Sequence, residues 1–167
     1  MSDLHQAHLS LGSNTQPETN LVRALELLQK YGELRKISNV WESESVGAEG
    51  PHYLNVCVLL VTPHTQTGLK EQALLPIEAG LGRQRGADKF APRTIDIDIV
   101  LFDGQSCDDR YWEQAFVVVP LAEIVREYQN PMTQEPISET ATRLRKQVWM
   151  ETRREVIHQF SRNRSGS

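Results

Sequence analysis

The sequence predicts an α+β fold in which helices pack on an antiparallel or mixed β-sheet. Runs rich in β-branched residues alternate with amphipathic stretches in the order strand, helix, strand, strand, helix, strand. This order is typical of the ferredoxin-like sandwich, which carries its helices on one face of the sheet. A chain of 167 residues is long enough to bury a core within a single domain. We therefore expect one domain over residues 1–160 and, from composition, a disordered tail over residues 161–167.

Two helices are predicted from apolar residues that recur at helical spacing. Pro76 lies inside the second and is expected to kink or shorten it, because proline has no N–H to donate. The Asp103-Gly104 pair predicts a turn, so that residues 105–112 return as part of a hairpin. The two apolar stripes are Leu21, Ala24, Leu25 and Leu28, then Leu69, Ala73 and Ile77. The predicted strands span 7–11, 34–41, 53–62, 94–102 and 116–119, and the predicted helices span 15–32, 65–81, 121–128 and 138–160.

Composition and charge narrow the classes of function. The formal net charge is −4, so the chain as a whole does not attract nucleic acid. No signal peptide is recognised, and no apolar run reaches the roughly 18 residues of a membrane span. Cys57 and Cys107 lack a metal-binding or redox spacing, and Cys57 lies in an apolar run, as expected for a buried thiol in a reducing cytoplasm. We expect a cytoplasmic monomer. The C-terminal helix, with Leu144, Val148 and Ile157 on one side, leaves a dimer contact open.

Asp96 and Asp98 form the most informative pattern in the sequence. Side chains alternate along a strand, so the two carboxylates point to one face while Ile95, Ile97 and Ile99 take the other. Adjacent carboxylates repel each other unless a cation lies between them. Oxygen ligands of this kind suit Mg²⁺, which completes its shell with waters and substrate phosphates. A solvated strand face is the alternative interpretation.

A basic segment leads into this pair. It contains Arg83, Arg85, Lys89 and Arg93. Four cations followed by two metal-binding carboxylates suggest a polyphosphate site. Surface charge on a loop is the alternative.

Other positions upstream suggest ligand binding. Gly12 permits either the close approach of a ligand or a tight turn. Tyr53 and Asn55 share one face of a predicted strand, and an aromatic ring beside an amide suits a flat, hydrogen-bonding heterocycle. A purely structural role for both residues is the alternative. The loop at 42–52 is long enough to act as a lid, or it serves only as a connection.

Several motifs together resemble one family. They are Ser10–Asn14 (SLGSN), Tyr53–Asn55 (YLN), Gly82–Arg85 (GRQR), Pro92–Asp98 (PRTIDID) and Phe116–Leu121 (FVVVPL). In this combination, over roughly residues 7–144, the chain resembles hydroxymethyl-dihydropterin pyrophosphokinase of the folate pathway. The Pro-Arg-x-apolar-Asp-apolar-Asp motif is the most specific of the set.

The resemblance implies a reaction and a set of site residues. ATP would transfer its β,γ-pyrophosphoryl unit to the hydroxymethyl oxygen of hydroxymethyl-dihydropterin and release AMP, with two Mg²⁺ ions bound by Asp96 and Asp98. The mobile loops would be 42–52 and 82–90. The implied catalytic residues are Arg83, Arg93, Asp96 and Asp98; the implied pterin-binding residues are Gly12, Val46, Tyr53, Asn55 and Phe116; and the implied nucleotide-binding residues are Glu78, Arg83, Arg85, Lys89, Arg93 and Ile99.

Segment 103–115 departs from the family pattern. It is short and lacks the Pro-His pair and the later arginine that would contact the nucleotide. Its remaining cation, Arg110, is flanked by Asp108 and Asp109, which compete for its charge. The motifs as a set lead us to expect an active pyrophosphokinase. The short segment 103–115 leaves open the alternative of a diverged pterin- or nucleotide-binding paralogue with little or no turnover. A ferredoxin-like interaction module without a small ligand is disfavoured, because a pure scaffold gains little from the aspartate pair.

Overall fold

A seven-stranded sheet forms the centre of the protein. The computed structural model describes residues 3–44, 50–82 and 94–165, and within them every strand pair is antiparallel. The strand order is β6-β5-β1-β4-β3-β7, and β2 also pairs with β4. The strands are β1 (His5–Ser13), β2 (Glu33–Ile37), β3 (Trp41–Ser43), β4 (Tyr53–Thr62), β5 (Asp96–Phe102), β6 (Gln105–Ser106) and β7 (Met150–Thr152).

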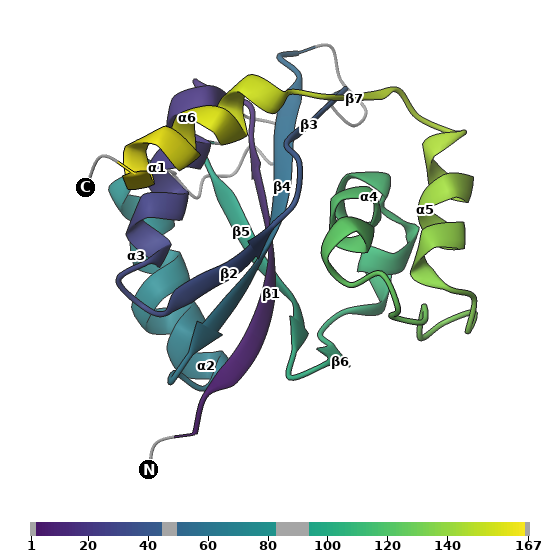
Figure 1. Cartoon of the computed structure of the whole chain (residues 1–167), viewed down its shortest axis with the longest axis horizontal. Helices are drawn as coiled ribbons and strands as arrows, with labels where there is room; N and C mark the ends of the chain where they lie inside the picture. The colour runs from purple at the N-terminus through teal and green to yellow at the C-terminus, as the bar shows by residue number, and fades with distance from the viewer. Residues whose placement is uncertain (1–2, 45–49, 83–93, 166–167) are drawn as a thin grey trace.

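Helices cover both faces of this sheet (Figure 1). On one side lie α1 (Pro17–Leu28), α2 (Gln66–Leu69), α3 (Leu75–Gly80) and α6 (Arg154–Ser165), and on the other lie α4 (Ala115–Ile124) and α5 (Ile137–Arg145). The predicted α+β sandwich is confirmed, but the prediction of helices on one face only is wrong. The reason lies in β4, which is buried at every position from Leu54 to Thr62 and therefore needs cover on both sides.

Two apolar cores result from this cover. Beneath α1, α2, α3 and α6, the sheet contributes alternate side chains such as Leu9, Val56 and Ile97. Beneath α4 and α5 it contributes Cys57 and Val100. Cys57 is a buried free thiol, as predicted, and burial raises the pKa of its sulfhydryl.

The second predicted helix continues through its proline. Five residues from Lys70 to Leu74 form a π-helical turn between α2 and α3, directly ahead of Pro76. A π turn shifts the carbonyl that the pyrrolidine ring would otherwise meet, so the helix widens and continues instead of ending. The stripe of Leu69, Ala73 and Ile77 is buried as predicted.

The segment after β6 differs from its predicted form. Residues 105–106 return against β5 as the expected hairpin, and a 3₁₀-helix follows at Asp109–Glu113. Residues 116–119 were predicted as a strand but belong to α4, which also contains Pro120. The prediction fails because a run that is apolar all round suits a helix buried between a sheet and another helix as well as it suits a strand.

The C-terminal third is also more broken than predicted. In place of one helix over 138–160, α5 ends at Arg145, β7 pairs with β3, and α6 then packs on α1. Leu144 and Ile157 therefore pack into different cores, and Val148 is 48% exposed, so the predicted shared stripe is wrong. The backbone of α6 runs through Ser165, past the position at which the sequence suggested a tail.

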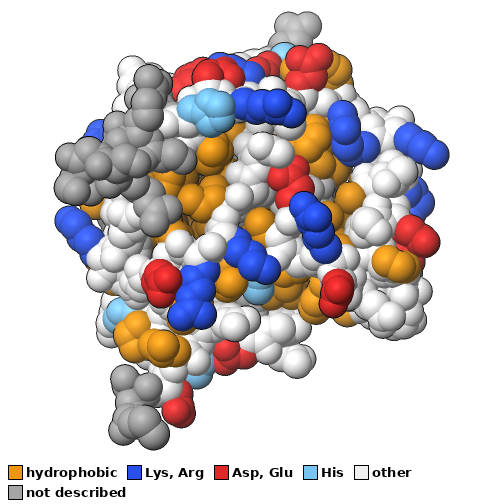
Figure 2. Space-filling view, viewed as in Figure 1, with side chains coloured by type: hydrophobic (Ala, Val, Ile, Leu, Met, Phe, Trp, Pro, Cys, Tyr) orange, Lys and Arg blue, Asp and Glu red, His pale blue; other side chains and the backbone are white. Residues whose placement is uncertain are grey.

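The face of the protein shown in Figure 2 is mixed in charge. On the face in Figure 2, acidic and basic side chains alternate, with hydrophobic side chains in small groups between them. Among the helices of the described residues, none combines the length and apolar character that crossing a membrane requires.

Candidate active site

The predicted site residues meet on the sheet face that α4 partly covers. In the antiparallel register, Gly12 of β1 lies opposite Asp96 of β5 on one side and opposite Asn55 of β4 on the other. Asn55 in turn lies opposite Trp41 of β3. Residues paired in this way share a sheet face. Positions far apart in the sequence therefore form one row across four strands.

The aspartate pair adopts the predicted alternation. Asp96 and Asp98 are half-buried, whereas Ile95 and Ile97 are fully buried in the opposite core. Asp98 lies opposite Ser10, one row below Asp96 and Gly12. The two carboxylates thus project from neighbouring rows of the same face.

The donor set fits Mg²⁺. It consists of carboxylate oxygens, the ligands that this hard cation prefers. Within the described ranges, no cluster of three or more His, Cys, Asp or Glu side chains forms a closed metal cage. A cation held by Asp96 and Asp98 would therefore complete its shell with water and ligand oxygens, as Mg²⁺ does at phosphate sites.

Asn55 is oriented by its neighbours. Its side-chain nitrogen donates to the Trp41 carbonyl at 3.2 Å and to Ser43 Oγ at 2.8 Å, which uses both amide hydrogens. The side-chain oxygen faces Gly12, because a Cβ built there would lie 3.2 Å from Asn55 Oδ1 and 3.9 Å from the Tyr53 ring. Asn55 thus presents an acceptor beside an aromatic ring. Gly12 lies within a strand and not in a tight turn, and the close approach of a ligand there stays a prediction.

The end of the SLGSN motif ties β1 to the start of β5. Ser13 Oγ donates to the Thr94 carbonyl and also approaches the Thr15 carbonyl. Ser13 and Asn14 are both buried. The motif therefore fixes the chain that leads into Asp96.

Glu78 is placed beneath β5. Its side chain is 2% exposed, and its Oε2 accepts a hydrogen bond from the Ile97 backbone N–H at 2.8 Å. Ile97 separates the two aspartates. Glu78, predicted as a nucleotide-binding residue, thus contacts the strand that carries Asp96 and Asp98.

A cavity of about 320 Å³ adjoins Asp98. Its walls come from the turn of α2 and the π-helix, from β5 and from the 3₁₀-helix; they are Gln66, Thr67, Lys70, Glu71, Asp98, Ile99 and Tyr111. Of these, Ile99 and Asp98 were predicted as site residues. Sequence reasoning missed the others, although Gln66 and Lys70 share a helix face at an i, i+4 spacing.

Tyr111 brings an aromatic ring and a hydroxyl to this cavity. Burial, followed by the negative charge of Asp98, raises the pKa of its phenol well above the ordinary value. The hydroxyl therefore remains a protonated hydrogen-bond donor at neutral pH. It belongs to segment 103–115, which the sequence marked only for what it lacks.

Arg110 forms an ion pair with Asp108. Its guanidinium binds Asp108 through Nε at 3.1 Å and Nη2 at 2.6 Å, and its side chain is 84% exposed. This bidentate pairing holds the pKa of Asp108 below its usual range. The predicted competition of an aspartate for this cation is confirmed in geometry.

Phe116 lies in the first turn of α4. Its side chain is half-buried against the α4–α5 core. The next carbonyl, that of Val117, accepts from the Cys57 thiol at 3.6 Å, and Cys57 lies two residues along β4 from Asn55. The N-terminal turn of α4 therefore overlies the strand that carries the amide.

Other predicted site residues lie outside the described ranges. They are Val46, Arg83, Arg85, Lys89 and Arg93. Their proposed roles stay predictions. The described residues that flank these two stretches are Glu44 and Gly50, and Gly82 and Thr94.

The fold and the candidate site define a class: an α+β protein of the ferredoxin-like type with two carboxylates and an oriented amide on one sheet face. The family model for 7,8-dihydro-6-hydroxymethylpterin-pyrophosphokinase (HPPK) matches residues 8–126. The chain belongs to this family.

Curated relatives extend over most of the chain. The chain is 33% identical to 2-amino-4-hydroxy-6-hydroxymethyldihydropteridine pyrophosphokinase of Bacillus subtilis, over 84% of its length and 90% of that protein. It is 36% identical to the enzyme of the same name from Synechocystis, over 76% of its length and 70% of that protein.

Solved structures show the same fold. An HPPK-DHPS triple mutant of Plasmodium falciparum, solved with pteroate, superposes with a TM-score of 0.66 at 12% identity and covers 87% of the chain. The chain spans 45% of that protein's length. At this identity the likeness concerns the fold alone.

Proposed function

We propose that this chain transfers a pyrophosphoryl unit from ATP to the hydroxymethyl group of 6-hydroxymethyl-7,8-dihydropterin and releases AMP. The observation that carries the proposal is the row of Asp96, Gly12 and Asn55 across three strands, in a chain of this family. This row places a carboxylate suited to a metal ion and an amide oxygen suited to a heterocycle on one sheet face, two strand spacings or about 10 Å apart. Asp98, in the neighbouring row, lines a cavity.

Pterin binding follows from the environment of Asn55. Because its amide hydrogens are used by Trp41 and Ser43, its oxygen is set to accept from an N–H of the pterin edge. Tyr53 supplies an aromatic surface beside it, and Phe116 in the first turn of α4 supplies a second. Val46 completes the set as a prediction from family resemblance.

Nucleotide binding is assigned to the cavity beside Asp98. Ile99 and Tyr111 provide an apolar wall for the base, while Lys70 provides a cation and Gln66 a hydrogen-bonding amide. These groups offer polar contacts in place of the histidine and arginine that segment 103–115 lacks. The site is concave and mixed in polarity, as small-molecule sites are.

The basic segment then completes the phosphate site. Arg83 and Arg93 are proposed to hold the phosphates, with Arg85 and Lys89 assisting, since guanidinium groups match phosphate oxygens in charge and geometry. Transfer would lean more heavily on Arg83 and Arg93 than on Arg110, which Asp108 already binds.

Asp96 and Asp98 are proposed to hold two Mg²⁺ ions together with ATP. When bound, the metal neutralises phosphate charge and lowers the pKa of the attacking hydroxyl. The two carboxylates supply fixed ligands from a strand packed on its other face by Ile95 and Ile97. Phosphoryl-type transfer depends mainly on positioning and charge neutralisation, so no nucleophilic side chain is required.

The alternative of a non-catalytic paralogue is not favoured. Relatives 31–36% identical to this chain, over most of its length, carry the name of the enzyme. We further propose a cytoplasmic monomer that does not bind nucleic acid or membranes. Size-exclusion chromatography with light scattering tests the oligomeric state.

A discontinuous assay for AMP tests the function. With hydroxymethyl-dihydropterin, ATP and Mg²⁺, AMP should form in proportion to the pterin consumed; without pterin it should not. Equal AMP release in both conditions would indicate hydrolysis, and no release in either would support the binding paralogue.

A further inference from the structure

The aspartate pair stands on an open edge of the sheet. β5 pairs with β1 along its length, but β6 pairs with β5 only at Leu101 and Phe102. Within the described residues, no strand covers the outer side of β5 at Asp96–Asp98. An edge strand lacks the second ladder of hydrogen bonds that fixes a central strand, so its position must be held by other means.

Glu78 meets this edge from the helical layer. It lies in α3, and its Oε2 accepts the outward N–H of Ile97 at 2.8 Å. With 2% exposure, the carboxylate is withdrawn from solvent. A buried charged acceptor makes a stronger bond to a backbone N–H than a neutral one does, and losing it leaves a buried donor unsatisfied.

We infer that Glu78 is a positioning residue for the metal site: it anchors the outer edge of β5 at Ile97 and so sets where Asp96 and Asp98 project. This inference rests on the proposed function and extends it. It gives Glu78 the role of holding β5 in place of the predicted role of binding the nucleotide. The bond acts at the one residue between the two carboxylates. Displacement of that residue would therefore shift both ligands together.

Two substitutions of Glu78 distinguish the loss of its hydrogen-bond acceptor from the loss of its side-chain volume. Glu78→Gln keeps a side-chain oxygen that can accept from Ile97, and Glu78→Leu keeps the approximate size but removes the acceptor. Leu34→Ala serves as the matched control for lost stability. Leu34 is buried in the apolar core beneath α3, but it lies on β2, which among the described strands pairs only with β4.

Two readouts are needed besides activity. The first is amide hydrogen exchange at Ile97 in the ligand-free protein, normalised to the exchange at Leu11 on β1. The second is binding of Mn²⁺ in the presence of a non-hydrolysable ATP analogue, followed by electron paramagnetic resonance. Thermal melting of every variant accompanies both.

The expected result is graded. Glu78→Leu should speed Ile97 exchange and weaken Mn²⁺ binding by roughly tenfold each, the scale of one buried hydrogen bond to a charged acceptor. Glu78→Gln should stay within about threefold of the wild type in both. Leu34→Ala should lower the melting temperature and leave Mn²⁺ affinity unchanged.

Other results would overturn the inference. If Glu78→Leu leaves Mn²⁺ affinity unchanged, Glu78 does not position the two aspartates. If Glu78→Leu does not fold, and Glu78→Gln loses affinity while Ile97 stays protected, the carboxylate acts directly on a ligand and not through β5. Weaker Mn²⁺ binding in Leu34→Ala would mean that the site responds to any loss of stability. If the wild type binds Mn²⁺ but Glu78→Leu behaves like it, only this inference fails; if the wild type binds no Mn²⁺, the proposed function fails with it.

Discussion

Replacement of Gly12 by alanine tests the pterin side of the site. The new Cβ would lie 3.2 Å from Asn55 Oδ1, a few tenths of an ångström inside ordinary contact, and 3.9 Å from the Tyr53 ring. The Asn55 side chain must therefore shift, yet its nitrogen is held by two hydrogen bonds. Displacing one acceptor and crowding the sheet face should weaken pterin binding by about 1–2 kcal/mol, or roughly 5- to 30-fold in Kd.

Stability should change little in the same variant. Gly12 has no left-handed backbone, and alanine reduces the entropy of the unfolded chain by about 0.4–1 kcal/mol, which offsets the crowding. Calorimetry with hydroxymethyl-pterin and, separately, with a magnesium-bound ATP analogue measures both affinities. Gly80→Ala is the control, because a Cβ there meets no atom within 4 Å. Wild-type pterin affinity in Gly12→Ala, or an equal loss for both ligands, would refute the assignment.

Further substitutions probe the remaining parts of the site and the fold. Asp96→Ala or Asp98→Ala should abolish Mg²⁺-dependent turnover with an unchanged circular dichroism spectrum, and near-normal kcat would show that the metal lies elsewhere. Phe116→Ala should weaken pterin binding by a few kcal/mol at most and ATP binding much less, as measured by calorimetry, since it removes aromatic contact area; equal losses would indicate a collapsed core. Arg110→Ala should cost less than about 1 kcal/mol, or about fivefold in kcat/KM, because the group is exposed and already paired; a larger loss would give it a direct role. Burial lowers the pKa of His8 from 6.5 to about 4, so the unfolded chain takes up a proton in this range before the folded one does and stability falls as pH drops from about 6.5 to 4. Urea titrations near pH 7 and pH 5 should show this decline in the wild type and a flatter profile in His8→Leu, whereas parallel profiles would exclude His8.

The aspartate strand was predictable because its signal is local. Alternation of aspartate with isoleucine fixes both the strand and the direction of Asp96 and Asp98, whatever the rest of the chain does. The same alternation along a strand places the side chains of Tyr53 and Asn55 on one face of the sheet. The register that sets Gly12 between Asp96 and Asn55 is not local, because it depends on three strands that are distant in sequence.

The helical state of α4 could not be predicted from a local sequence pattern. Its run of three valines favours a strand by intrinsic preference, and Pro120 argues against a helix interior. Tertiary packing overrides both, because the segment fills the space between β4 and α5 and is apolar on every side. The placement of Phe116 in a helical first turn follows from that packing.

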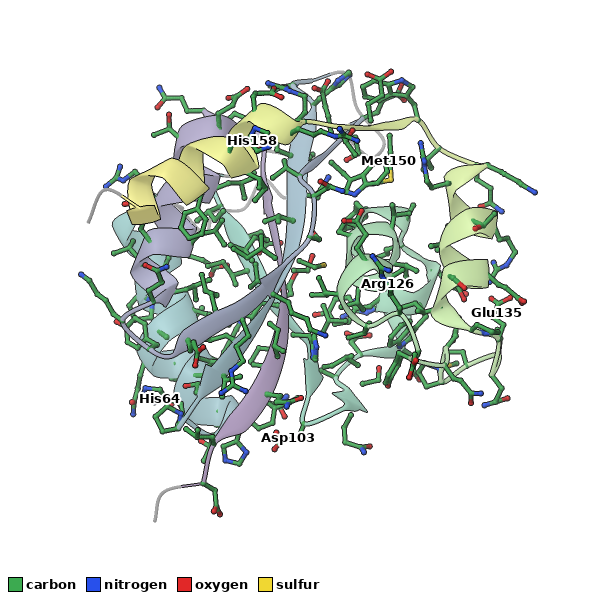
Figure 3. All side chains as sticks on the ribbon, in the orientation of Figure 1. His64, Asp103, Arg126, Glu135, Met150 and His158 are labelled. Carbon is green, nitrogen blue, oxygen red and sulfur yellow. The ribbon has the colours of Figure 1, made fainter. Side chains whose placement is uncertain are left out.

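The three-residue strand β7 has a similar origin. Residues 150–152 carry too few side chains to show a period, and β7 exists because β3 offers it an edge. Met150 points from β7 toward α4 (Figure 3) and is buried in the α4–α5 core. β7 flanks Ser43, whose hydroxyl orients Asn55, so a segment beyond the family match supports the predicted pterin site.

Transfer of an intact pyrophosphoryl unit is the central claim, and ³¹P nuclear magnetic resonance of the complete reaction tests it most directly. With wild-type protein, hydroxymethyl-dihydropterin, ATP and Mg²⁺, the β and γ resonances of ATP should be replaced together by two coupled resonances of a pterin diphosphate ester, with one AMP formed per ester. Asp98→Ala should produce neither. Appearance of ADP with a single phosphate on the pterin, or of free inorganic pyrophosphate alone, would contradict the claim.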